Sequence, residues 1–180
     1  MSFFGGLGFG FSQQIEEQDR LEELREKLRP ARLRGKKFCV KCGFCCHART
    51  CIPTPSELKK IATFLKLTPK ALIKKYYAID RKSGDEIYYV KPLGKNIKDL
   101  AGKFIPASRT FNEGDCVFLG KNNLCKIYPV RPATAKASKC WLQDKDKENI
   151  ITEQTIKKWG GNQLKKQFGI DGNKEEEKVE

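Results

Sequence analysis

The sequence predicts a small α+β domain, mainly helical and irregular, with a short β-hairpin and with its cysteines gathered around one centre. Three observations lead to this fold class. Five of the eight cysteines fall between Cys39 and Cys51, helix start signals follow this cluster, and short β-rich runs alternate with glycine turns. A length of 180 residues suits one domain with tails, because a single core organises about 100–200 residues.

Composition divides the chain into four parts. Residues 1–12 form a Gly/Phe-rich segment, residues 13–30 an N-terminal helix, residues 31–168 the cysteine-cluster domain with its motif core at 39–141, and residues 169–180 an acidic tail that we expect to be disordered. In the second part, leucines at three–four spacing ahead of a proline predict the helix.

Two strong helix start signals follow the cysteine cluster. Thr54-Pro55-Ser56-Glu57 is a capping box with proline at the first helical position, so a helix is predicted to begin at Pro55. Thr68-Pro69 repeats the signal, and apolar residues at helical spacing continue a second helix to Tyr76. Residues 150–168 also have helical spacing, which Gly160-Gly161 interrupts.

Short β-forming runs lie between these helices. The Ser83-Gly84 turn leads into EIYYV at residues 86–90, which predicts a strand. Further on, VFL and LCKIY predict a hairpin closed around GKNN. This hairpin would place Cys116 and Cys125 at the two ends of one small turn unit.

Charge is concentrated in the first half of the cysteine domain. Residues 29–109 carry 20 Lys and Arg against 5 Asp and Glu, whereas the whole chain has a net charge of +14. Such a segment attracts phosphate, an acidic protein or an anionic membrane, although a merely solvated lysine face has the same composition. Lysines beside the cysteines would also offset the negative charge of a thiolate-bound metal.

The N-terminal residues indicate in which redox compartment the protein is expected. MSFFGGLGFGF has no basic residue ahead of its apolar run, so it makes a poor signal peptide. No stretch of the sequence approaches the roughly 18 continuous apolar residues of a membrane helix. We therefore expect a cytoplasmic protein, in which reduced thiols indicate metal binding rather than disulfides.

The spacing of the first cysteines indicates the kind of metal. Cys39, Cys42 and Cys45 are each two residues apart, which lets a tight loop turn three thiolates toward one centre. Bacterial ferredoxins hold a four-iron cluster in this way, whereas zinc modules more often pair one C-x-x-C with a distant second one. The spacing favours an iron–sulfur cluster, with 4Fe-4S ahead of other types, over zinc.

The other cysteines leave the number of centres open. Adjacent side chains diverge, so either Cys45 or Cys46 should face another centre, another iron of a cluster or no metal. Two centres, or one centre with spare thiols, fit the count of cysteines. Cys51 is equally consistent with a small buried side chain. His47 stays outside the ligand set, because the thiols suffice. The full set of candidate ligands is Cys39, Cys42, Cys45, Cys46, Cys51, Cys116, Cys125 and Cys140.

Three motifs in order along the chain are CVKCGFCC, the Thr-Pro-x-Glu helix start and CVFLGKNNLCKIYPVRP. With these motifs the chain resembles, from about Cys39 to Trp141, the YkgJ family, the CxxCxxCC zinc- or iron-chelating cysteine-cluster domain. The resemblance implies a further family cysteine three residues after Pro132, but Ala135 stands there. Cys140 is the nearby replacement if one or two helical turns follow Pro132. The family's metal cysteines then correspond to Cys39, Cys42, Cys45, Cys46, Cys116 and Cys125.

These features predict a structural or electron-transfer metal module that docks on a partner protein through its N-terminal segment. One alternative is a zinc-stabilised basic module that binds RNA or the ribosome through residues 29–109, with Tyr76, Tyr77, Tyr88 and Tyr89 for stacking. The other is an iron–sulfur-assisted methyltransferase-like enzyme, which resemblance to the flagellin lysine-N-methylase suggests. An enzyme is the minor alternative, because nothing in the sequence indicates a methyl-donor pocket and 180 residues leave little room for one.

Overall fold

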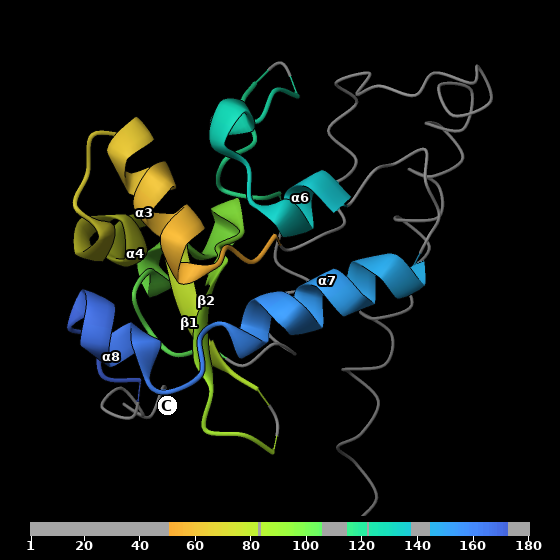
Figure 1. Ribbon diagram of the computed structural model, residues 1–180. Helices are drawn as coiled ribbons and strands as arrows, with labels where there is room; N and C mark the ends of the chain where they lie inside the picture. Colours follow the sequence, from red (N-terminus) through yellow and green to blue (C-terminus); the bar gives the residue numbers. More distant parts are fainter. Residues whose placement is uncertain (1–50, 83, 106–114, 122, 138–144, 173–180) are drawn as a thin grey trace, which may run out of the picture.

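The fold is seen in a computed structural model that describes residues 51–82, 84–105, 115–121, 123–137 and 145–172 (Figure 1). Helices and an antiparallel hairpin confirm the α+β class, while its organisation around a metal stays a prediction. The elements are α3 (Pro55–Phe64), α4 (Pro69–Tyr76), β1 (Tyr77–Arg81), β2 (Tyr88–Pro92), the 3-10 helices η1 (Lys95–Leu100) and η2 (Tyr128–Val130), α6 (Ala133–Ala137), α7 (Lys145–Lys157) and α8 (Gln163–Phe168).

Both predicted helix starts are confirmed. The hydroxyl of Thr54 accepts a hydrogen bond from the Glu57 N–H at 3.2 Å, and the Glu57 carboxylate accepts one from the Thr54 N–H at 2.9 Å. These two bonds complete a capping box, which satisfies N–H groups that a helix start leaves without partners. At α4, the Thr68 hydroxyl accepts from the Ala71 N–H at 3.2 Å.

The β-structure is a two-stranded antiparallel hairpin. The predicted strand is present but lies two residues later, as β2, and its partner β1 follows α4 without a connecting loop. Ile79 stands opposite Val90, and Asp80 stands opposite Tyr89. The sequence did not predict β1, because a charged residue occupies one of its buried positions.

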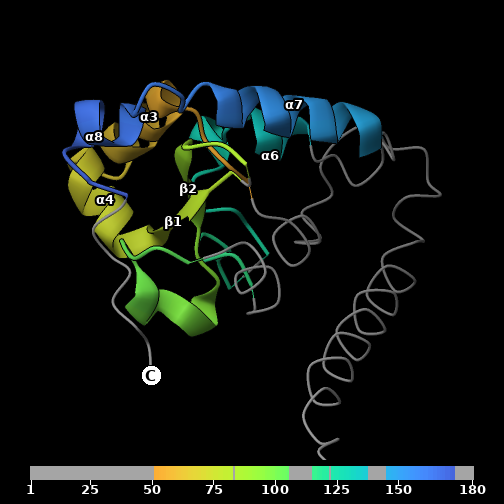
Figure 2. The ribbon, with the colours of Figure 1, turned by 90° about the horizontal axis from the view of Figure 1, so that it is seen from below.

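The helices cover the hairpin from two directions. Figures 1 and 2 show α3, α4 and α8 together on one side of it, while α7 runs past it toward α6. The predicted interruption at Gly160-Gly161 is confirmed, since it separates α7 from α8 and Gly161 has a φ of +67°. None of the helices in the described ranges is long and apolar enough to cross a lipid bilayer. The predicted helix at 13–30 lies outside these ranges.

A polar cluster is buried between the two strands. Asp80 and Lys91 are each 2% exposed, and the Lys91 ammonium donates to the Asp80 carboxylate at 2.7 Å. The Tyr89 hydroxyl donates to the same oxygen at 2.8 Å, and the Arg81 N–H donates to the other oxygen at 2.8 Å. Burial lowers the pKa of Lys91, while the hydrogen bond and charge of Asp80 oppose this shift.

Removing Asp80 should be costly, because it would leave the Lys91 ammonium buried without a counter-charge. We expect Asp80→Ala to lose about 3–5 kcal/mol of unfolding free energy, measured by urea denaturation. The double variant Asp80→Ala with Lys91→Met should lose less than the single one, since no charge is then stranded. Lys82→Ala, in the exposed ion pairs with Asp85 and Glu153, is the control and should leave the midpoint unchanged. A single variant as stable as this control would contradict the role of the buried pair.

Candidate metal centre

Three of the eight candidate ligands lie in the described part of the chain, and each is half-buried. They are Cys51, Cys116 and Cys125. The other five lie outside the described residues, so their roles stay predictions. They are Cys39, Cys42, Cys45, Cys46 and Cys140.

Cys116 and Cys125 belong to one compact turn unit, residues 115–128, as the sequence predicted. Leu119 and Cys125 form an antiparallel bridge, and the Gly120 N–H donates to the Leu124 carbonyl at 2.8 Å. Among the described residues of this unit, the expected hairpin is therefore reduced to the Leu119–Cys125 bridge without continuous strands. A Cβ at Gly120 would stand 3.0 Å from the Leu124 oxygen, which explains why glycine occupies this tight turn.

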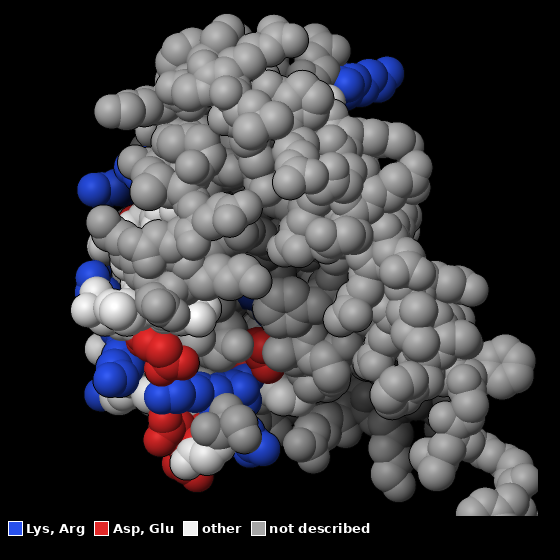
Figure 3. All heavy atoms as spheres, turned by 90° about the vertical axis from the view of Figure 1, so that its right-hand side faces the viewer, with Lys and Arg blue, Asp and Glu red and all other residues white. Residues whose placement is uncertain are grey.

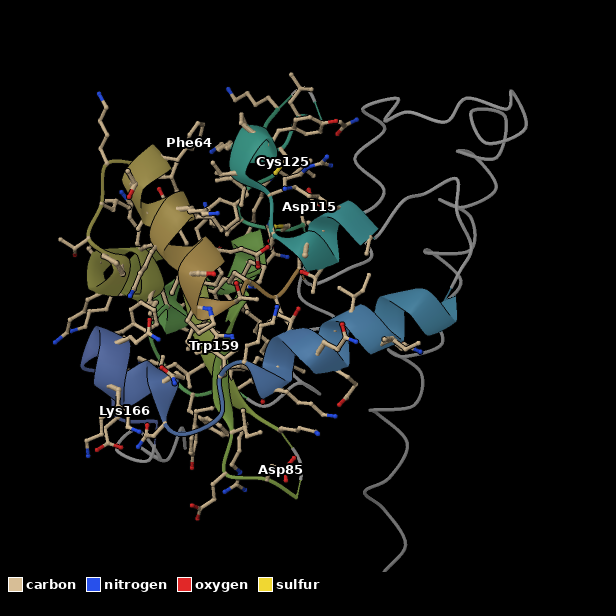
Figure 4. All side chains as sticks on the ribbon, viewed as in Figure 1. Phe64, Asp85, Asp115, Cys125, Trp159 and Lys166 are labelled. Atoms are coloured by element: carbon tan, nitrogen blue, oxygen red, sulfur yellow. The ribbon has the colours of Figure 1, made fainter. Side chains whose placement is uncertain are left out.

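The turn unit is fastened to the hairpin and to α4. Cys116 bridges to Gly94 just after β2, and the Val117 N–H donates to the Leu93 carbonyl at 2.8 Å. The ring of Phe118 packs against Tyr76 and Tyr77 at centroid distances of 5.2 and 5.7 Å. These contacts hold Cys116 on a rigid part of the domain, and Figure 4 shows Cys125 in the same unit, between α3 and α6.

Cys51 precedes a short segment that is tied down at every residue. The Ile52 carbonyl accepts from the Thr134 hydroxyl at 2.6 Å, and the Pro53 carbonyl accepts from the Trp159 indole N–H at 2.8 Å. Thr54 then caps α3. Trp159 is fully buried, so this anchor reaches into the core. The point where the cysteine cluster joins the domain is thereby fixed.

The segment that leads toward Cys140 begins as predicted. One short helix, α6, follows Pro132, and its first N–H, of Ala133, donates to the Glu57 carboxylate at 2.8 Å. Glu57 therefore serves the starts of both α3 and α6. A carboxylate at a helix start is stabilising because it meets the positive end of the helix dipole. The replacement of the family cysteine absent at Ala135 by Cys140 stays a prediction.

The three described cysteines share one electrostatic neighbour, Tyr77. Burial raises the pKa of its phenol well above the ordinary value, and the negative charges of Cys116, Cys51 and Cys125 raise it further. Within the described ranges, however, no three His, Cys, Asp or Glu side chains stand close enough to hold a metal ion. A centre on this side of the domain therefore needs thiolates from elsewhere in the chain.

Arg131 follows η2 directly and belongs to the Cys-x-Ile-Tyr-x-x-Arg-Pro segment. Its guanidinium stacks on the Tyr128 ring at 3.8 Å, and its buried Nε has no hydrogen-bond partner among the described residues. The N–H of Tyr128 donates to the Cys125 carbonyl at 3.0 Å, which fixes the backbone of the stacked pair to that of a candidate ligand. The Tyr-x-x-Arg spacing is the only sequence signal for the stacked pair.

These features define a small cysteine-rich domain with sulfur donors for a metal. The chain belongs to the CxxCxxCC family, described as "Putative zinc- or iron-chelating domain", whose family model matches residues 38–159. All eight cysteines lie within the match. This finding confirms the resemblance to the CxxCxxCC domain, while the YkgJ assignment stays a prediction.

One relative illustrates how far the similarity extends. An uncharacterized protein of Methanocaldococcus jannaschii is 35% identical over 95 residues, which cover 52% of this chain and 39% of the relative. The matched part of this chain thus corresponds to about two fifths of that protein. No solved structure matches the chain significantly.

The Glu57 carboxylate should stabilise the two helix starts that flank the cysteines. Glu57→Ala removes acceptors from Thr54 and Ala133, and we expect a loss of about 1–2 kcal/mol in unfolding free energy. Glu57→Gln keeps one acceptor oxygen and should lose less. Lys60→Ala, on the exposed side of α3, is the control in the same urea titration. Equal stability of Glu57→Ala and the control would contradict the shared-cap role.

Tyr77 and Tyr89 should resist ionisation in the folded protein. Burial raises the pKa of both, and the hydrogen bond to Asp80 raises that of Tyr89 further. Because their folded pKa values exceed the unfolded value of about 10, the stability they contribute is complete below pH 10 and is lost as pH rises above it. The pKa of Lys91 is lowered in the folded protein, so the unfolded state binds the proton more tightly. The contribution of Lys91 to stability therefore rises, rather than falls, as pH increases.

Tyrosinate absorbance measures this resistance. At about pH 11 the folded protein should show fewer tyrosinates than its five tyrosines allow, and urea should release the rest. Tyr89→Phe should remove one of the late-titrating groups. Ionisation of all five tyrosines near pH 10 without unfolding would contradict the burial argument.

Proposed function

We propose that the chain binds an iron–sulfur cluster, with 4Fe-4S favoured, through the thiolates of residues 39–46 and of the turn unit. The cluster would serve a structural or electron-transfer role in a protein that docks on a partner through residues 1–12. The observation that carries this proposal is the C-x-x-C-x-x-C series inside the family match, the spacing with which bacterial ferredoxins deliver three thiolates to a four-iron cluster.

The donor chemistry of the described residues fits this proposal. Sulfur ligands suit iron–sulfur clusters and zinc, and the turn unit offers Cys116 and Cys125 on a rigid support. Since no described set of three ligands is complete, most donors would come from the cysteine cluster ahead of Cys51. Binding across separate segments would add its energy to folding, which suits a chain whose charged fraction is 32%.

Zinc is the second candidate, because the family description covers both metals. Eight thiols are enough for two closed four-thiolate sites, and such sites are structural. Cys51 and the turn unit would then hold a structural zinc ion that has no redox role. With a structural zinc ion, the function of the protein would lie in interactions at its surface.

Metal and acid-labile sulfide, measured on protein purified without oxygen and without added metal, test the proposal. We expect iron with a matching amount of sulfide, and Cys42→Ser should lose most of both. Ala71→Ser, on the exposed side of α4, is the control and should keep them. Zinc in a colourless protein would replace the cluster by the structural alternative. Protein without either metal would overturn both.

A further inference from the structure

The outer sides of three neighbouring helices form a surface of one charge sign that the proposed metal centre does not use. α3 packs against both α4 and α8, and Figures 1 and 2 show the three on one side of the domain. Their exposed lysines, together with the one in the α3–α4 connection, make up what we call the lysine face. They are Lys59, Lys60, Lys66, Lys70, Lys74, Lys75, Lys165 and Lys166.

The acidic residues of the same segments are already engaged. Residues 55–76 contain one acid, Glu57, whose oxygens cap two helices. Residues 163–172 contain one, Asp171, which pairs with Lys165 at 2.9 Å. The face as a whole therefore keeps a large excess of positive charge, which attracts polyanions.

The tip of the hairpin is different. There Lys82 pairs with Asp85 at 3.1 Å and with Glu153 at 3.3 Å. Figure 3 accordingly shows blue and red atoms interspersed at the lower end of the described surface. Paired charges of this kind are ordinary solvated surface, and the lysine face lacks this pattern.

The residue types of the face argue against a protein partner or a membrane. Protein interfaces are enriched in arginine and aromatic residues and depleted of lysine, but residues 55–76 and 163–172 contain no arginine. Membrane-surface helices place apolar side chains beside their lysines. Here the apolar side chains of these helices are buried, and Phe64 (Figure 4) is the large exposed one among their described residues.

Within the described ranges, the four tyrosines predicted to stack on bases offer little exposed ring surface. Tyr77 and Tyr89, two of the four tyrosines predicted for stacking, are only 1% and 7% exposed, so that prediction is wrong for them. Tyr76 and Tyr88 are half-buried and pack against Phe118 and Phe104. Among the described residues of the lysine face, Phe64 is the one exposed ring, and a single ring gives no row of stacking sites for successive bases.

We propose that the lysine face binds the phosphate backbone of duplex nucleic acid without reading its sequence. Lysine ammonium groups are compact point charges, which suit phosphate contacts rather than bidentate reading of base edges. Lys70 and Lys74 are one helical turn apart, so both project from the same side of α4 and reach one backbone together. The binding rests on described residues only and does not depend on which metal the cysteines hold.

The test is the salt dependence of binding to an RNA duplex and to a DNA duplex of the same sequence, with the full chain as purified. For the wild type, the logarithm of the binding constant should fall linearly with the logarithm of salt concentration. Lys60→Glu with Lys70→Glu should weaken binding roughly tenfold or more at low salt and flatten the slope by about two. Whichever duplex binds more tightly supports the proposal and identifies the source of the phosphates.

Matched controls separate this surface from general charge and from folding. Lys121→Glu with Lys136→Glu makes the same change in net charge on exposed lysines of the turn unit and α6, and should retain most of the affinity. Lys60→Gln with Lys70→Gln is the milder variant, and unchanged circular dichroism and metal content establish that the variants fold. The binding test stays valid if the wild-type protein holds zinc instead of iron or holds no metal. The proposal of an iron–sulfur cluster and the proposal of duplex binding can therefore fail independently.

Several results would overturn the proposal. One is no duplex binding at about 50 mM salt, where phosphate contacts are strong. Another is an equal loss of affinity in the face variant and the matched control. Binding to phosphatidylserine vesicles without binding to duplexes would assign the face to a membrane. A preference of more than about a hundredfold among duplex sequences would show base reading instead.

Discussion

The carboxylate of Glu57 is the contact on which the arrangement of the cysteine-bearing segments depends. One oxygen closes the capping box of α3 and the other accepts from the first N–H of α6. Ile52 and Pro53 are tied to α6 and to Trp159 within the same few residues. These bonds join residues that are far apart in sequence. The segment just after Cys51 therefore lies next to the start of α6, from which the chain continues toward Cys140.

Local signals predicted the parts of this fold that local interactions create. The capping residues Thr54 and Thr68 and the glycine pair after α7 act within a few residues, so their effects could be read directly from the sequence. The strand β1 was missed because Asp80 is buried only through its bonds to Tyr89 and Lys91 across the hairpin. Pairing across the hairpin overrode the weak local pattern.

The candidate site was predictable to a similar extent. The cysteine spacing identified the chemistry, and the turn residues identified the unit that carries Cys116 and Cys125. The fixed positions of Cys51 and of the turn unit could not be foreseen, since they require the docking of Phe118 and the anchoring of Ile52 by Thr134. The stacking of Arg131 on Tyr128 likewise depends on the local conformation of η2.

The central claim is that cysteine sulfur binds a metal in this domain. X-ray absorption spectroscopy at the metal edges of the as-purified full-length protein tests it most directly. We expect an iron edge with a first shell of sulfur and a second shell of neighbouring iron, as in a cluster. A zinc edge with sulfur at about 2.3 Å would keep cysteine ligation and change the metal. A first shell of oxygen and nitrogen alone would contradict the account.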